Sequence, residues 1–286
     1  MRNTRNIGTM RRMLLQNSSV EVSRYPGLSR FGDISHFVTS RAGGVSEGNY
    51  ASMNLGLYSG DSRERVDENI CRLMTGLGLE PERLLLPRQV HGCRVAVVDR
   101  TFTQLSGVER EARLEGFDAL ITADPGVCVA VATADCVPVL LYAADKRVVA
   151  AVHAGWRGTV SRIAELTLQR MVDEFGCDPR QVWAAIGPSI SPSAFEVGEE
   201  VVDAFHDAGF DLSRLLLRDP DSGKGHIDLW EANRMSLTGA GLDGDHIELA
   251  GICTYERFSD YFSARRLGIQ SGRFLSGIYI NEAVLP

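Results

Sequence analysis

Short apolar runs of strand length fill the middle of the chain. Four of them follow one another between residues 119 and 153, and they are rich in β-branched residues, which favours buried strands. Further runs of the same kind lie on either side of this block. We expect strands at residues 37–40, 95–98, 119–122, 127–132, 137–142, 148–153, 182–186, 247–252 and 275–280.

Helical periodicity alternates with these runs. In residues 61–77 the apolar positions Val66, Ile70, Leu73 and Leu77 recur at helical spacing. We also expect helices at 160–175, 199–208 and 229–237, and a polar loop over residues 100–116, part of which (103–114) is expected at the site entrance. Such alternation predicts an α/β or α+β fold. The chain contains no low-complexity linker and no repeat, so we expect one domain over residues 31–286, after a poorly ordered N-terminal arm of residues 1–30.

Charge and apolar content narrow the class of protein. The 30 basic and 37 acidic side chains give a net charge of −7, so a global basic field for nucleic acid or an anionic membrane is absent. The longest apolar stretch, residues 127–144, contains Asp135 and Pro138 and is better explained as two strands than as a membrane span. The Arg-rich first twenty residues lack a signal-peptide core, and a transit-like leader is the less favoured alternative.

The cysteines indicate the compartment. Six of them are dispersed along the chain without a C-x-x-C pair, which is typical of reduced thiols in a cytoplasmic protein.

Three groups that bind metal interrupt apolar segments at the edge of a strand or turn: His91, Cys136 and His153. Two imidazoles and one thiolate suit zinc, and a catalytic zinc site keeps its fourth position open. The ligands are separated by 45 and 17 residues, so the whole fold must assemble them, unlike the short ligand pairs of structural zinc modules. Each residue alone could equally be a packed core residue, and Cys136 with either histidine could form a nucleophilic thiolate–imidazolium pair.

Other metal chemistries have sequence patterns that this chain lacks. The H-x-E and P-C-x-x-C motifs of zinc deaminases of the cytidine type are absent, as is H-E-x-x-H. The chain has six histidines and no H-x-H pair, which argues against a multicopper oxidase.

A glycine-rich turn follows His153. Gly155 and Gly158 let the backbone approach a ligand, the following helix start offers free N–H groups, and Arg157 adds a cation, which together favour phosphate. The lysine of a P-loop is missing, and a tight turn with Trp156 packed inside is the alternative.

Other charged residues are weaker candidates. Arg41, beside two glycines, and the pair Arg265-Arg266 could bind the same anion, although surface arginines are the commoner explanation. Asp118 and Asp135 could orient a metal ligand or carry a proton, or could simply lie at turns and strand edges.

With these residues in place, the chain resembles the YfiH or laccase-domain family, in ten motifs that run in order from about residue 37 to the C-terminus. The motifs are Gln89-Val90-His91-Gly92, Thr133-Ala134-Asp135-Cys136-Val137-Pro138, His153-Ala154-Gly155-Trp156-Arg157-Gly158-Thr159 and the segments 39–46, 53–56, 118–122, 186–190, 195–198, 253–255 and 262–266.

The resemblance implies a single layered domain of mixed β-sheets flanked by helices. It also implies one zinc ion per chain, held by His91, Cys136 and His153, which would also be the catalytic residues. It implies phosphorolysis of adenosine, inosine, guanosine and S-methyl-5′-thioadenosine, together with adenosine deamination. The expected partners are a nucleoside and phosphate, without nucleic acid or membrane, in a monomer or small homo-oligomer.

Older assignments of the family are polyphenol oxidase, with copper, and bacterial members are linked to quality control of peptidoglycan precursors. Copper is disfavoured here by the histidine pattern. The chain departs from the usual family pattern at Ala194-Phe195, Ala264 and Ser271, which leaves the zinc ligands intact and bears on substrate preference. The competing hypotheses are therefore a polyphenol oxidase, a Cys-His hydrolase and a binding protein without turnover.

Overall fold

The computed structural model describes residues 7–16 and 18–282, which form strands, α-helices and short 3-10 helices. The strands are β1 (Arg11–Leu14), β2 (Glu21–Arg24), β3 (Ile34–Thr39), β4 (Leu84–Leu85), β5 (Val95–Val97), β6 (Ala119–Thr122), β7 (Cys128–Thr133), β8 (Val137–Ala143), β9 (Val148–Ala154), β10 (Val182–Ile186), β11 (Glu196–Val197), β12 (Leu216–Arg218), β13 (Gly225–Ile227), β14 (Ile247–Leu249) and β15 (Phe274–Ile280). The α-helices are α1 (Pro26–Ser29), α2 (Arg63–Leu77), α3 (Gly107–Arg113), α4 (Trp156–Val160), α5 (Ile163–Phe175), α6 (Glu199–Asp207), α7 (Leu212–Leu215), α8 (Leu229–Gly239) and α9 (Ala264–Leu267). The 3-10 helices are η1 (Gly48–Tyr50), η2 (Pro81–Arg83), η3 (Arg100–Gln104), η4 (Pro179–Gln181) and η5 (Gly244–His246).

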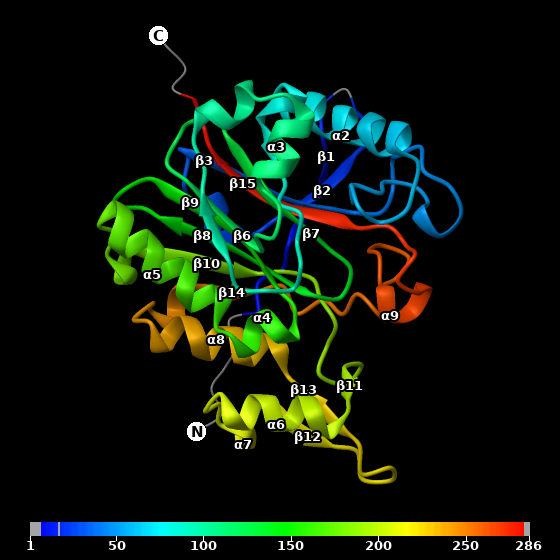
Figure 1. Cartoon of the computed structure of the whole chain (residues 1–286), viewed down its shortest axis with the longest axis vertical. Helices are drawn as coiled ribbons and strands as arrows, with labels where there is room; N and C mark the ends of the chain where they lie inside the picture. The colour runs from blue at the N-terminus through cyan, green and yellow to red at the C-terminus, as the bar shows by residue number, and fades with distance from the viewer. Residues whose placement is uncertain (1–6, 17, 283–286) are drawn as a thin grey trace.

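Two mixed six-stranded sheets form the centre of the fold. One has the strand order β1-β2-β3-β15-β7-β4, and the other has the order β14-β10-β8-β9-β6-β5. The sheets pack against each other through β7, β9 and β15, helix α2 lies on the outer side of the first sheet, and α4, α5 and α8 lie on the outer side of the second. The predicted α/β architecture of layered mixed sheets flanked by helices is confirmed (Figure 1).

Side-chain alternation explains why the central strands are apolar throughout. In β9, Val149 and Ala151 face the other sheet, whereas Val148, Ala150 and Val152 pack under the helices. A strand buried on both faces needs apolar side chains at every position. This is why the middle of the sequence shows continuous apolar runs instead of strict alternation.

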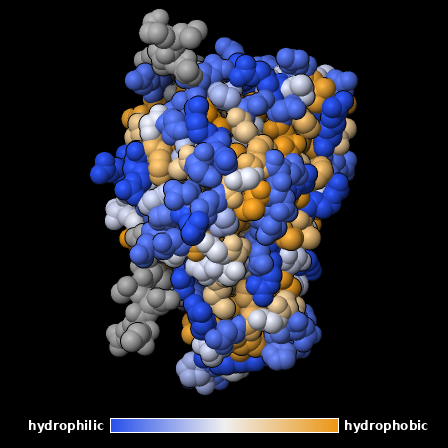
Figure 2. Space-filling view, turned by 90° about the vertical axis from the view of Figure 1, so that its left-hand side faces the viewer, coloured by the Kyte–Doolittle hydropathy of each residue, from blue (hydrophilic) through white to orange (hydrophobic). Residues whose placement is uncertain are grey.

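A small third sheet, with the order β11-β13-β12, lies with α6 and α7 at one end of the molecule (Figure 1). On the face drawn in Figure 2, apolar side chains lie in patches between hydrophilic ones. Within the described part of the chain, no helix combines the length and apolarity needed to span a bilayer.

The structure differs from the sequence prediction in three segments. Residues 100–116, predicted as a loop, contain η3 and α3, and α3 starts with a capping box in which Ser106 and Glu109 bond reciprocally, so a Ser-x-x-Glu signal was overlooked. The helix predicted over 160–175 begins at Ile163 as α5, after Arg162 with its left-handed φ of 57°, and the turn predicted before it contains the short helix α4. The predicted arm of residues 1–30 supplies β1, β2 and α1, while residues 1–6 and 17 lie outside the described residues.

His36 on β3 gives the fold an acid-sensitive contact. Its Nε2 accepts a hydrogen bond from the backbone N–H of Tyr25 at 2.8 Å, and burial, together with the charge of Arg24, lowers its pKa to about 3. An unfolded chain takes up this proton near pH 6.5, so the folded state loses stability as the pH falls from there towards 3, by about 3 kcal/mol at pH 4. His36→Gln keeps a hydrogen-bond acceptor but carries no group that titrates in this range. Between pH 7 and pH 4 we expect its free energy of unfolding, measured with denaturant, to fall by about 3 kcal/mol less than that of the wild type. An equal pH dependence in both proteins would contradict this account.

Candidate metal centre and active site

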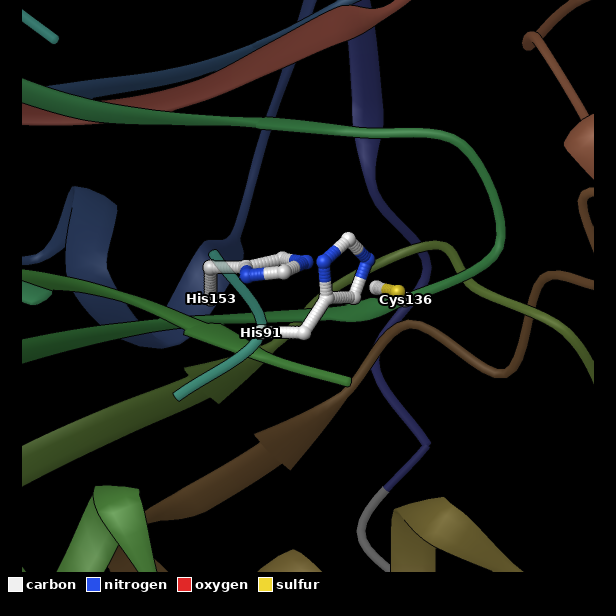
Figure 3. Close-up of side chains that lie close together, drawn as sticks. All are labelled: His91, Cys136 and His153. Atoms are coloured by element: carbon white, nitrogen blue, oxygen red, sulfur yellow. The ribbon is translucent and has the colours of Figure 1, made fainter. Parts of the chain in front are cut away.

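Three side chains from separate segments meet beside the second sheet. His91 lies between β4 and β5, Cys136 lies in the turn between β7 and β8, and His153 lies on β9. One potential ligand atom from each lies within 4.8 Å of the others, and the two imidazole rings meet edge to face with centroids 4.8 Å apart. Figure 3 shows the three side chains clustered with their polar atoms close together. The structure thus brings together the three residues that the sequence singled out as metal ligands.

Asp118 holds two of these ligands in position. Its side chain is buried, and Oδ1 lies 2.8 Å from Nδ1 of His153. The same carboxylate accepts hydrogen bonds from the backbone N–H groups of His91 at 2.9 Å and Gly92 at 2.8 Å. An Nδ1–H bond to the carboxylate leaves the Nε2 lone pair of His153 for the cluster, which is the usual arrangement behind a metal-bound imidazole.

The thiol and the imidazole polarise each other. Burial by itself raises the pKa of Cys136, but the charges and hydrogen bonds of His153 and His91 lower it to about 6. Burial likewise opposes the charge of His153, but Cys136 and Asp118 raise its pKa to about 9. Cys136 is therefore a thiolate near neutral pH, which is the form that binds metals or acts as a nucleophile.

The turn that carries Cys136 is fixed by its neighbour Asp135. Asp135 adopts a left-handed φ of 85°, and its carboxylate accepts hydrogen bonds from the hydroxyl of Thr254 at 2.6 Å and the backbone N–H of Arg265 at 2.7 Å. Asp135 therefore joins three segments and orients the turn before Cys136. Its carboxylate is committed to these contacts.

Gly155 lies directly against the cluster. A Cβ at this position would be 3.1 Å from Cδ2 of His91 and 3.2 Å from the sulfur of Cys136. Such contacts force the ligands apart by a few tenths of an ångström. The absence of a side chain at residue 155 is therefore a condition for the close approach of the three ligands.

We expect Gly155→Ala to weaken zinc binding by about tenfold or more, because the added methyl group displaces ligand side chains from the positions in which hydrogen bonds to neighbouring residues hold them. Competition with a chromogenic chelator measures this. Gly239→Ala is the matched control, since a Cβ there meets no atom within 4 Å. Equal zinc affinity in both variants would show that the ligands tolerate the methyl group.

A cavity of about 690 Å³ opens above the cluster. This volume lies within the range of small-molecule sites, roughly 300–1,000 Å³. Its walls include Trp156 and Phe195, with Tyr58 on the side of α3. The hydroxyl of Tyr58 donates to Glu111 of α3 at 3.2 Å, so the segment 103–114 contacts the cavity wall, in keeping with its expected place near the entrance.

The residues predicted to bind phosphate are placed differently from one another. Arg157 lines the cavity, with its guanidinium stacked 4.3 Å from the centroid of Trp156. Gly155 is buried against the His-Cys-His cluster and is not among the residues that line the cavity. Gly158 is buried, and a Cβ there would be 2.9 Å from the carbonyl oxygen of Gly92, so its role is close packing.

Arg41 is not among the residues that line the cavity, and its guanidinium donates to the carbonyl oxygens of Ala51 and Phe258. Helix α4 is five residues long and provides little of the helix dipole that the prediction invoked.

Sequence reasoning missed other residues of this site. The side chain of Gln89 pairs with both the N–H and the carbonyl of Ala132, at 2.8 and 2.9 Å, and so fixes the segment before His91. Thr133 and Arg273 also line the cavity. Gln89 and Thr133 belong to the motifs that carry His91 and Cys136, which was the available signal, whereas Arg273 had none.

The donor set fits a zinc ion. Two imidazoles and one thiolate leave a fourth position open, as in catalytic zinc sites. A mononuclear copper site of the electron-transfer type has the same donors plus an axial methionine, and no methionine lines the cavity in the described part of the chain. Within residues 7–16 and 18–282, the cluster of His91, Cys136 and His153 is the one group of three potential ligands.

Comparisons with known proteins identify the family and support the fold. Residues 35–281 match the family described as multi-copper polyphenol oxidoreductase laccase. A purine nucleoside phosphorylase from Bacteroides thetaiotaomicron is 52% identical over 258 residues, which cover 90% of this chain and 96% of that protein. A protein of an unknown prokaryotic organism, named Adenosine deaminase RL5, is 45% identical over 243 residues, which cover 85% of this chain and 92% of that protein. The crystal structure of YlmD from Geobacillus stearothermophilus superposes with a TM-score of 0.84 at 32% identity and covers 95% of this chain and all of that one.

Proposed function

The chain belongs to the multi-copper polyphenol oxidoreductase laccase family, and we propose that it is a zinc-dependent purine nucleoside phosphorylase that also deaminates adenosine. Adenosine, inosine, guanosine and S-methyl-5′-thioadenosine are the proposed substrates, with inorganic phosphate as the co-substrate. The observation that carries the proposal is the His-Cys-His cluster at the wall of a nucleoside-sized cavity. The names of the relatives, purine nucleoside phosphorylase and adenosine deaminase, support the reaction types.

The proposed zinc is held by His91, Cys136 and His153, with Asp118 behind His153. When bound, zinc supplies Lewis acidity to an oxygen of the substrate or of water. Of the charged groups at the cavity, Arg157 lies exposed above Trp156, where it attracts an anionic co-substrate.

Phosphorolysis replaces one bond at the ribose. A phosphate oxygen attacks C1′, the bond from C1′ to the purine N9 breaks, and its electron pair leaves with the base, which takes up a proton. Positive charge builds on the ribose and negative charge on the base, so a bound phosphate stabilises the ribose electrostatically. Aromatic walls at Trp156 and Phe195 provide flat apolar surfaces for the purine.

The oxidase interpretation of the family description lacks the ligands that it requires. A multicopper centre needs several groups of imidazoles, whereas the described residues contain a single three-ligand cluster. The polarised Cys136 thiolate favours a Cys-His hydrolase as the second candidate. Metal analysis separates these functions, because the hydrolase keeps full activity without zinc and the oxidase carries copper.

The decisive experiment incubates the purified protein with inosine or adenosine, with and without phosphate. We expect free base together with ribose 1-phosphate only when phosphate is present, and inosine from adenosine without phosphate. Elemental analysis should give about one zinc per chain. Release of free ribose, or the absence of any turnover in a zinc-loaded protein, would contradict the proposal, and the latter would favour a binding role in precursor quality control.

A further inference from the structure

Arginines line the cavity without carboxylate partners. Arg157, Arg265 and Arg273 all belong to its wall, and none lies within ion-pair distance of an acidic side chain in the described part of the chain. Arg157 and Arg265 are exposed and lie over Trp156 and Phe195, whereas Arg273 is half-buried. The guanidinium of Arg273 is partly shielded from bulk water, so solvent weakens its attraction for an anion less than it weakens that of the two exposed arginines.

The hydrogen bonds of Arg273 leave one edge of its guanidinium unused. Nη1 donates to the carbonyl oxygens of Ser271 at 2.7 Å and Gly272 at 2.9 Å and to the hydroxyl of Ser271 at 3.2 Å, and Nη2 donates to the carbonyl oxygen of Ile269 at 3.0 Å. The Nε–H and the second proton of Nη2 have no acceptor among the described residues. The side of a guanidinium that carries Nε and Nη2 can match two oxygens of a phosphate or carboxylate.

A buried hydroxyl without a partner belongs to a residue of the same cavity wall. Thr133 ends β7, pairs with Phe274 of β15, the residue that follows Arg273, and lines the cavity. Its side chain is 1% exposed, and its Oγ1 has no hydrogen-bond partner in the described residues. A buried hydroxyl is costly when it is left unbonded, so this one indicates a ligand that accepts its proton.

We propose that Thr133 and Arg273 form the seat of the inorganic phosphate co-substrate. Arg273 donates two hydrogen bonds from its free edge, and the Thr133 hydroxyl donates a third. Thr133, Arg273 and Cys136 line the same cavity, so the seat places the phosphate in the cavity that the metal cluster adjoins. This inference rests on the proposed phosphorolysis and names the residues that bind its second substrate.

Gly56 makes room for this arrangement. A Cβ at Gly56 would be 2.7 Å from Cγ of Arg273, so the arginine stem packs flat on the glycine backbone. A cationic ligand is repelled by such a guanidinium, whereas an oxyanion can accept hydrogen bonds from all three free donors.

Thr133→Val tests the seat with almost no change in side-chain shape. We expect the KM for phosphate to rise about tenfold, as for the loss of one hydrogen bond to a charged group, while the KM for inosine stays within about twofold. In phosphate-free buffer the Tm of the variant should equal or exceed that of the wild type, because the unbonded hydroxyl has been removed. A residue with a merely structural role would give the opposite pattern: a lower Tm and an unchanged KM for phosphate.

Ser276→Ala is the matched control. Ser276 on β15 is also 1% exposed with an unbonded hydroxyl, and it does not line the cavity. It should leave both KM values as in the wild type. Arg273→Lys keeps the charge but loses the paired donors, and we expect a still larger rise in the KM for phosphate, of about 100-fold.

Calorimetric titration of inorganic phosphate into the zinc-loaded protein, without nucleoside, separates this inference from the proposed function. Weaker phosphate binding in Thr133→Val than in the wild type supports the seat even if no nucleoside is turned over. If the wild type performs phosphorolysis but Thr133→Val binds phosphate with unchanged affinity, the proposed function stands and the seat is wrong. Selective loss of binding to a nucleoside 5′-monophosphate, with phosphate binding unchanged, would likewise overturn it.

Discussion

Cys136→Ala is expected to lower the rate of phosphorolysis by about 10³-fold or more and to reduce the zinc content to a small fraction of one ion per chain. The thiolate is one of three donors in the cluster, and no other cysteine or histidine of the described residues is placed to replace it. The loss corresponds to about 4 kcal/mol of transition-state stabilisation, which is the scale of a metal's contribution. Phosphorolysis kinetics and elemental analysis of the same preparation provide the measurement.

Cys93→Ala is the control for this variant. Cys93 is two residues from His91, is exposed, and does not line the cavity, so its loss should leave rate and zinc content unchanged. A Cys136→Ala protein that retains zinc but loses activity would instead indicate a nucleophilic thiol. A variant that keeps both zinc and activity would remove Cys136 from the site.

Much of the fold was predictable because its central strands are buried on both faces. Continuous apolar runs of strand length mark such strands in the sequence, and β6 and β10 begin and end at the predicted residues. The short strands β4, β11, β12 and β13 carry no such signal, because two or three residues show no periodicity. Their positions depend on pairing with distant segments.

The ligands were predictable for a related reason. His153 lies in a strand whose other residues are apolar, so a polar group that binds metals stands out there. His91 and Cys136 also interrupt apolar segments. The sequence could not show that their side chains meet, because that depends on the packing of β9 against β8 and on the loop that Asp118 holds.

The phosphate residues were harder to predict. A glycine-arginine turn such as the segment at Arg157 is compatible with anion binding, but only the structure separates glycines needed for packing from glycines that face a ligand. Gly158 is of the first kind, against the backbone of Gly92. Conversely, nothing in the sequence distinguishes the free edge of Arg273 from that of any other arginine.

Asp118→Asn is expected to have the second largest effect. Burial raises the pKa of Asp118, but the hydrogen bond and charge of His153, with the backbone N–H groups of Gly92 and Val90, lower it below its usual value, so the group is an anion that only accepts hydrogen bonds. An asparagine presents an NH₂ group to one of these donors and removes the charge behind His153. We expect zinc affinity to fall about 10- to 100-fold and the free energy of unfolding to fall by about 3 kcal/mol.

Two measurements distinguish positioning of the ligands from general stability. Chelator competition on the folded variant measures zinc affinity. Denaturant unfolding of the zinc-free protein measures the free energy of unfolding without any contribution from the metal. Asp173→Asn on the exposed side of α5 is the control and should change neither, since its carboxylate contacts only Gln169 among the described residues. If Asp118→Asn loses stability while its zinc affinity equals that of the wild type, Asp118 supports the fold alone. Weakened zinc affinity in a variant that remains folded would show that this buried carboxylate positions His91 and His153 for the metal.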